Sequence, residues 1–261
     1  MAKKRNRVHS EESEEEGEDA WATSKSKPKT SRRSRSRSKG PESNNKTTAR
    51  TTTPVTPPTK SAPQSMQVAR PLALLVCSIG NPGATYANTL HSAGHNVLIR
   101  VAERLGHSKF QKDKSLGGGL VSKSSQTSAQ GADWVLWQST SSMNLSGKGI
   151  RAAWNTWSKD FPEGQARLVV VHDELDKALG VVSVRTAQGL SARGHNGLKS
   201  LLATMGKVPF TRIGIGIGRP ESRDSNDVAN YVLRKMTSEE RAKVEGCADE
   251  VAAKLEGLAK G

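Results

Sequence analysis

The fold is set by the stretch Leu72-Ala73-Leu74-Leu75-Val76-Cys77-Ser78-Ile79, an apolar run that ends at the turn sequence Gly80-Asn81-Pro82-Gly83. A short apolar run bounded by turn residues is typical of a strand that is covered on both faces. Apolar residues at helical spacing then follow from His91 to Leu105. The sequence therefore predicts a strand, a turn and a helix, with a titratable histidine where the strand opens to solvent.

Strand and helix patterns alternate through the rest of the chain. Strands are expected at residues 134–137, 168–171, 181–185 and 213–217, and helices at 146–158 and 196–205. One final helix is expected to begin with a capping box at Thr237 and to present Val244, Cys247, Val251, Leu255 and Leu258 on one face. This alternation predicts a single α/β domain with a mixed, mostly parallel sheet flanked by helices.

The N-terminal quarter of the chain has a different composition. Residues 1–65 are built from Ser, Thr, Pro, Lys, Arg and Glu without apolar periodicity, so burial cannot offset the entropy of ordering them. We expect a disordered tail and linker over residues 1–65 and the folded domain over residues 66–261. Alternating Arg and Ser at residues 31–38 suit regulated contact with RNA or protein, and they equally suit a solvated linker.

Both parts of the chain are basic. Residues 1–65 hold fifteen Lys or Arg against eight Asp or Glu, a net charge of +7, which leaves +8 of the total of +15 for the remaining residues. A basic folded domain attracts polyanions. Nucleic acid is therefore favoured as a partner over the alternative of a merely soluble basic protein.

Cysteine usage and hydropathy indicate the compartment. Cys77 and Cys247 are the two cysteines, and both fall within apolar patterns, which favours core positions over a disulfide or a zinc site. No apolar run approaches the ~20 residues that cross a bilayer. We expect an intracellular protein without a membrane segment, placed first in the cytoplasm, with the mitochondrion and the nucleus left open.

Polar clusters follow the expected strands or begin the expected helices. They are Met143-Asn144, His172-Asp173-Glu174 and Gly194-His195-Asn196-Gly197. In an open α/β sheet such positions gather along one edge, where ligands bind. A carboxylate such as Asp173 can orient an imidazole through its ring N–H, and asparagine can hold a water or a carbonyl without adding charge. Each residue alone could be a cap or a turn residue, but together they indicate a small hydrolytic site.

Five ordered motifs within these clusters resemble those of bacterial-type peptidyl-tRNA hydrolase over about residues 72–236. They are Gly80-Asn81-Pro82-Gly83-Ala84-Thr85-Tyr86, His91-Ser92-Ala93-Gly94, Met143-Asn144-Leu145-Ser146-Gly147-Lys148, His172-Asp173-Glu174-Leu175-Asp176 and Gly194-His195-Asn196-Gly197-Leu198-Lys199. The resemblance implies a single-domain α/β enzyme that cleaves the ester joining a peptide to the terminal ribose of tRNA, without metal or other cofactor.

The resemblance also implies roles for individual residues. His91 would be the general base that activates water, and Asp173 would hold it in position. Asn81 would bind the peptide, Asn144 and Asn196 would complete the substrate contacts and stabilise the transition state, and Tyr86 and Met143 would shape the pocket. The basic side chains within or beside the motifs are candidates for tRNA phosphates: Lys148, Arg185, Arg193, Lys199 and Arg212.

The chain departs from the family pattern at several positions. Leu90 and Ser92 replace the Arg and Asn that commonly flank the histidine, and Gly214 stands where a phosphate-binding Arg is often found. The loop from Thr186 to Arg193 is slightly longer and less rich in glycine than usual. These departures bear on activity and on substrate choice.

Two other functions are compatible with the same residues. One is an RNA-binding module of this fold with weak or no catalysis, used in RNA processing. The other is a generic esterase, which so basic a chain does not favour, while the absence of a Gly-X-Ser-X-Gly elbow argues against a serine hydrolase. We expect a monomer that acts on peptidyl-tRNA.

Overall fold

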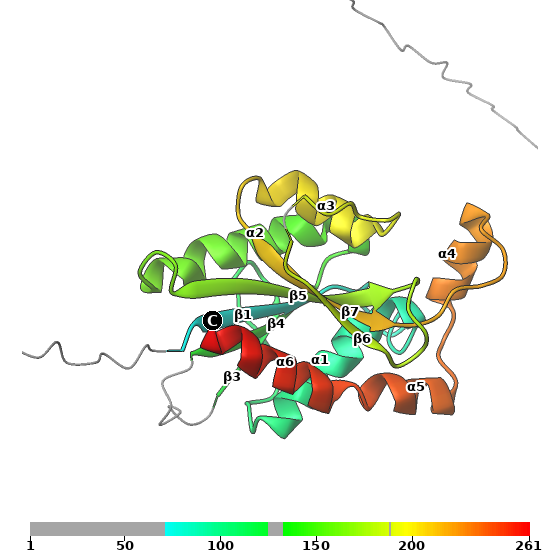
Figure 1. The fold of residues 1–261 in the computed structure, drawn as a ribbon, viewed down its shortest axis with the longest axis horizontal. Coiled ribbons are helices and arrows are strands. Elements are labelled where there is room, and N and C mark those ends of the chain that lie inside the picture. Colours follow the sequence, from blue (N-terminus) through cyan, green and yellow to red (C-terminus); the bar gives the residue numbers. More distant parts are fainter. Residues whose placement is uncertain (1–70, 125–132, 188) are drawn as a thin grey trace, which may run out of the picture. The chain divides into compact units, whose positions relative to one another are not determined.

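The computed structural model describes residues 71–124, 133–187 and 189–261, and the tail predicted for residues 1–65 lies outside these ranges. Within them, seven strands form one sheet in the order β2-β3-β4-β1-β5-β7-β6 (Figure 1). The strands are β1 (Ala73–Ser78), β2 (Gln111–Lys112), β3 (Leu120–Lys123), β4 (Trp134–Gln138), β5 (Ala166–Glu174), β6 (Val182–Arg185) and β7 (Phe210–Gly216).

The four central strands are parallel, whereas β2, β3 and β6 pair antiparallel at the two edges. The predicted mixed, mostly parallel sheet is therefore confirmed. β1 is buried on both faces: Leu74 and Val76 belong to one core cluster, and Leu75 and Cys77 belong to the other. This two-sided burial is the physical reason for the uninterrupted apolar run in the sequence.

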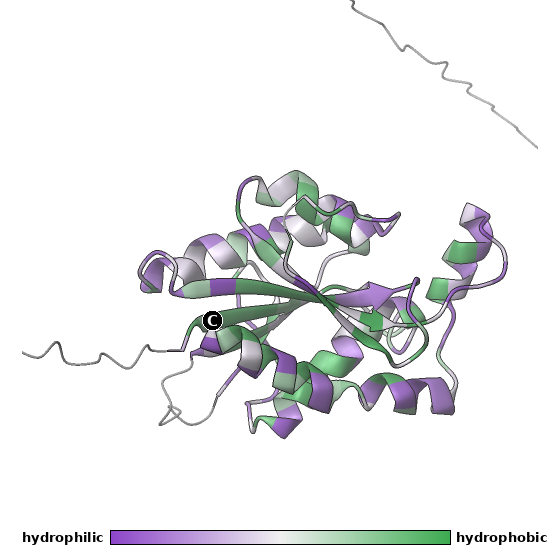
Figure 2. Cartoon of the chain, viewed as in Figure 1, coloured by the Kyte–Doolittle hydropathy of each residue, from purple (hydrophilic) through white to green (hydrophobic). Residues whose placement is uncertain are grey.

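Helices cover both faces of the sheet (Figures 1 and 2). On one face lie α1 (Ala93–Arg104), α5 (Ser238–Glu245) and α6 (Ala248–Lys260), and on the other lie α2 (Ser146–Trp157) and α3 (Asn196–Met205). α4 (Ser225–Leu233) lies beyond the end of β7, and the short 3-10 helices are η1 (Leu90–Ser92), η2 (Met143–Leu145) and η3 (Ser158–Asp160). None of the helices in the described part of the chain has the length and apolar character to cross a membrane.

The expectation of one final helix is wrong, because the structure has two helices there. The capping box of Thr237 and Glu240 is present and starts α5, but the chain leaves that helix at Gly246 and begins α6 at Ala248. Gly246 has low helix propensity, which makes a break there inexpensive. Cys247 lies between the two helices and donates its thiol to the backbone oxygens of Gly180 and Lys243. Cys247 and Cys77 are both buried and form no disulfide. The expected core positions of both cysteines are confirmed.

Close packing of α1 against β5 brings the motifs together. A Cβ atom on Gly94 would lie only 2.7 Å from the carbonyl oxygen of Val171, so only glycine allows the start of α1 to approach β5 this closely. η1, which carries His91, directly precedes α1, and Asp173 lies two residues after Val171 on β5. The glycine therefore determines how near the histidine comes to the carboxylate.

Candidate active site

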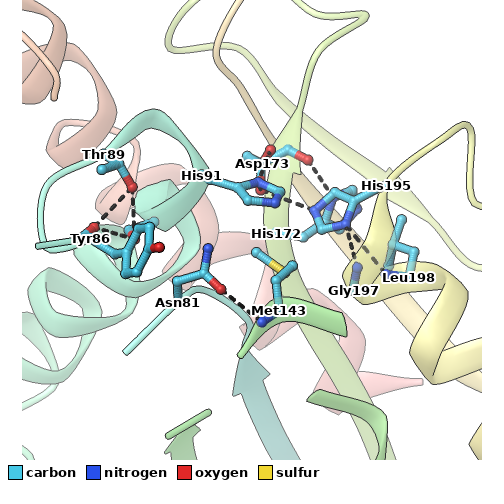
Figure 3. Close-up of polar contacts among 11 residues, drawn as sticks. Asn81, Tyr86, Thr89, His91, Met143, His172, Asp173, His195, Gly197 and Leu198 are labelled. Atoms are coloured by element: carbon cyan, nitrogen blue, oxygen red, sulfur yellow. Dashed lines mark hydrogen bonds and ion pairs between the residues drawn. The ribbon is translucent and has the colours of Figure 1, made fainter. Parts of the chain in front are cut away.

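His91 and Asp173 form the centre of the site at the carboxyl end of β5 (Figure 3). The His91 Nδ1 atom lies 2.9 Å from each of the two carboxylate oxygens of Asp173. An ionised carboxylate only accepts hydrogen bonds, so Nδ1 carries the ring proton and donates it. The other nitrogen, Nε2, is left with a lone pair that can accept a proton, and His91 lines a cavity. This is the tautomer that a general base requires.

A second imidazole contacts the same carboxylate. The His195 Nε2 atom lies 3.0 Å from Asp173 Oδ1, while its Nδ1 accepts the backbone N–H groups of Gly197 at 3.1 Å and Leu198 at 3.4 Å. His195 is therefore the N-cap of α3. No role for His195 was predicted from the sequence, although it stands directly before a helix whose first amides need an acceptor.

The electrostatics follow from these contacts. Burial alone would raise the pKa of Asp173, but the imidazoles of His91 and His195 hold it well below its usual range. Burial alone would lower the pKa of His91, but the charge and the hydrogen bond of Asp173 outweigh burial and raise it above its ordinary 6.5. Asp173 is thus ionised, and His91 is a somewhat stronger base than a free histidine.

His172 is a neutral neighbour of this pair. Its Nδ1 atom is 2.6 Å from the backbone oxygen of Asp173 and donates to it. Burial, followed by the nearby His195, lowers the pKa of His172 to about 3. His172 therefore lines the cavity without charge.

The cavity beside the two histidines has a volume of about 620 Å³, and ten of the twelve residues proposed from the sequence line it. Asn81 accepts the backbone N–H of Met143 through Oδ1 at 2.8 Å, and its amide nitrogen lies on the side away from Met143 (Figure 3). A Cβ atom on Gly197 would lie 2.5 Å from the Met143 sulfur, so this glycine lets α3 pack against η2. Asn144 and Asn196 complete this wall of the cavity.

Tyr86 and Lys148 are the two proposed residues that do not line the cavity. Tyr86 is 37% exposed, and its backbone oxygen accepts the hydroxyl groups of Thr89 and Ser92. Lys148 is exposed in the first turn of α2. Tyr86 thus contributes through its backbone to the turn that precedes His91.

The basic side chains differ in how freely they meet solvent. Arg212 is only 5% exposed and donates to the backbone oxygens of Leu190 and Ser191 at 2.7 and 2.9 Å. Its guanidinium group therefore stabilises the loop that contains Leu190 and Ser191 and is largely shielded from solvent. Arg185 lies 3.7 Å from Glu174. Arg193 and Lys199 are exposed. Two further arginines line the cavity and were not predicted from the sequence: Arg219, which pairs with Asp176 at 2.8 Å, and Arg223.

Within the described ranges, one cluster has the spacing of metal ligands, namely His91, Asp173 and His195. Its donor chemistry does not suit a metal. A metal on His195 Nε2 would need the ring proton on Nδ1, and Nδ1 faces the N–H groups of Gly197 and Leu198, which can only donate. The cluster is therefore better described as a hydrogen-bonded His–Asp–His arrangement.

An α/β domain with a histidine, a buried carboxylate and asparagines at one sheet edge has the groups of a hydrolase site. Residues 75–261 match the family model described as peptidyl-tRNA hydrolase. The peptidyl-tRNA hydrolase of Frankia casuarinae is 41% identical over 167 residues, which cover 64% of this chain and 78% of that protein. That of Mycobacterium tuberculosis is 39% identical over 171 residues, covering 66% and 83%.

A solved structure agrees with the sequence comparison. The peptidyl-tRNA hydrolase of Acinetobacter baumannii superposes with a TM-score of 0.59 at 31% identity, covering 73% of this chain and 89% of that one. The chain belongs to the peptidyl-tRNA hydrolase family.

Proposed function

We propose that His91 is the general base of this peptidyl-tRNA hydrolase and that it activates the water which cleaves the ester between peptide and tRNA. The observation that carries the proposal is the pair of hydrogen bonds from His91 Nδ1 to Asp173, because they leave the Nε2 lone pair available at the cavity. No covalent nucleophile is needed, since an ester is activated enough for attack by base-assisted water.

The placement of the groups supports the following course for the proposed reaction. His91 Nε2 takes a proton from water as the water oxygen attacks the ester carbonyl carbon, and Asp173 stabilises the imidazolium that forms. The bond to the terminal ribose oxygen then breaks, and His91 returns the proton to that oxygen. Asn81, Asn144 and Asn196, which line the cavity, would bind the peptide and donate N–H groups to the developing oxyanion.

A turnover assay with the full chain tests the function. Peptidyl-tRNA should be cleaved to free tRNA and peptide, whereas aminoacyl-tRNA and a small ester should be cleaved slowly or not at all. The RNA-binding alternative predicts tRNA binding without cleavage. The generic esterase predicts comparable turnover of the small ester, so either outcome would remove the proposal.

The exposed basic residues near the cavity are proposed contacts for tRNA phosphates, foremost Arg193, Lys199 and Arg223. Each phosphate contact releases a counterion, so Lys199→Ala should reduce the slope of log affinity against log salt by about 0.7 to 0.9. Lys254→Ala is the matched control, because Lys254 is an exposed lysine on α6, on the other face of the sheet. Equal slopes for the two variants would remove Lys199 from the interface.

We also propose that the protein acts as a monomer in the cytoplasm and that the Arg/Ser segment at residues 31–38 contacts RNA or protein. Sedimentation of the purified chain tests the monomeric state, and a stable dimer would contradict it. Fractionation of cells tests the cytoplasmic location, and recovery of the protein in another compartment would contradict it. Crosslinking of the full chain tests the Arg/Ser segment, and recovery of neither RNA nor protein at residues 31–38 would contradict that contact.

A further inference from the structure

The Asp173 carboxylate accepts hydrogen bonds from two imidazoles, and the general-base proposal uses only one of them. His91 Nδ1 is 2.9 Å and His195 Nε2 is 3.0 Å from Asp173 Oδ1. We propose that His195 is a positioning residue that fixes the Asp173 carboxylate toward His91 and takes a share of its negative charge. The kinetic part of this inference rests on the proposed function, but the geometric part does not.

The start of α3 fixes the tautomer of His195. Its Nδ1 atom faces the N–H groups of Gly197 and Leu198, so Nδ1 must be the acceptor and Nε2 must carry the hydrogen. The ring is therefore held between helix amides on one side and Asp173 on the other. Its donor to Asp173 is built into the fold, because rotating the ring away would uncap the helix.

Asp173 is the charged group that shifts the pKa of His91, although other charged side chains line the same cavity: Glu174, Asp176, Arg185, Arg193, Lys199, Arg212, Arg219 and Arg223. Asp173 faces His91 from β5, and the His195 ring lies with its centroid 5.0 Å away, with His172 beyond that ring at 5.3 Å. α4 packs against η1, but none of its side chains that line the cavity titrates: Ser225, Val228, Ala229, Val232 and Leu233. The electrostatic environment of His91 is thus set by Asp173 and by His195, which donates to the same carboxylate.

Removing the His195 donor has a defined sign. The carboxylate would direct its full charge and both oxygens at His91, so the pKa of His91 would rise further above 6.5. Less of the base would be free at neutral pH, and the carboxylate would lose one of the two contacts that set its rotation. Both effects slow the reaction.

Two variants separate this role from helix capping. His195→Asn keeps a side-chain oxygen that caps α3 well but is too short to reach Asp173. His195→Gln places an amide N–H near the position of Nε2 and gives up the cap. Leu202→Ala is the control, since Leu202 is an exposed residue of the same helix. The readouts are the NMR titration of His91, the pH profile of kcat/KM for peptidyl-tRNA, and the melting temperature.

We expect His195→Asn to raise the pKa of His91 and to lower kcat/KM at neutral pH about tenfold, with α3 still capped and a melting temperature above that of His195→Gln. His195→Gln should retain most of the activity but melt at a lower temperature. The reverse pattern, or equal behaviour of both variants, would overturn the inference. Because the NMR titration needs no substrate, a failure of the proposed function would show as absent turnover by the wild type and leave this test intact.

Discussion

His91→Ala should lower kcat/KM for peptidyl-tRNA by about 10³- to 10⁴-fold, near the upper limit of what one general base contributes. The structure leaves no obvious substitute at its place. Two other imidazoles lie nearby. Burial lowers the pKa of His172 to about 3, which makes it a weak base. His195 has its Nδ1 lone pair engaged by the start of α3 and its Nε2 proton engaged by Asp173. Neither nitrogen of His195 is free to accept a proton from water. Steady-state kinetics with peptidyl-tRNA measure this decrease in kcat/KM.

A truncation at His91 also removes a donor from the buried Asp173, which could disturb the site for structural reasons. His91→Asn is the matched variant, because an asparagine Nδ2–H lies near the position of the histidine Nδ1–H and can still donate to Asp173. It should be as inactive as His91→Ala while melting at the wild-type temperature. Appreciable turnover by the asparagine variant would mean that His91 is not the base.

The parts of the site that the sequence could predict are those that local patterns determine. β1 was recognisable because burial on both faces requires an apolar residue at every position. α3 was recognisable from its apolar spacing, and it begins at Asn196 and ends at Met205 as expected. Since parallel strands share one carboxyl edge, the convergence of His91 on Asp173 could be inferred before any distance was known.

What the sequence could not predict depends on contacts between distant segments. Arg212 reads as a basic residue beside a motif, yet its partners are two carbonyl groups of a loop about twenty residues earlier in the chain. Tyr86 reads as a pocket residue, yet it is the backbone of that turn that is bound. His195 stands directly before an expected helix, and only the fold reveals that its ring both caps that helix and reaches Asp173. A side chain's type limits its partners but does not choose among them.

The altered neighbours of His91 illustrate the same point. Leu90 is fully buried and belongs to the core that α1, α5 and α6 cover. Ser92 is 2% exposed and donates its hydroxyl to the backbone oxygen of Tyr86 at 2.8 Å. Neither lines the cavity. The two departures from the family pattern therefore lie in the anchoring of η1 and outside the lining of the cavity.

In the profile of kcat/KM against pH, Asp173→Asn should lower the plateau by roughly 10³-fold. It should also move the acidic limb to lower pH, the opposite direction to His195→Asn. With His91 as the proposed base, wild-type activity should rise with pH as His91 loses its proton, at a pKa raised above 6.5 by Asp173. Without the carboxylate charge, burial dominates and the pKa of His91 falls below 6.5, so the limb moves to lower pH.

The plateau falls for a separate reason, because the asparagine amide can donate to Nδ1 and favour the tautomer with the proton on Nε2, where no lone pair remains to take a proton from water. A pH profile of kcat/KM from about pH 5 to about pH 9 measures both effects. A lowered plateau with an unmoved limb would mean that Asp173 fixes the tautomer without setting the basicity of His91. An acidic limb at lower pH with an unchanged plateau would mean that Asp173 sets the basicity of His91 without fixing its tautomer. The shared carboxylate of this site requires both effects together, since the same two oxygens hold the proton on Nδ1 and supply the charge.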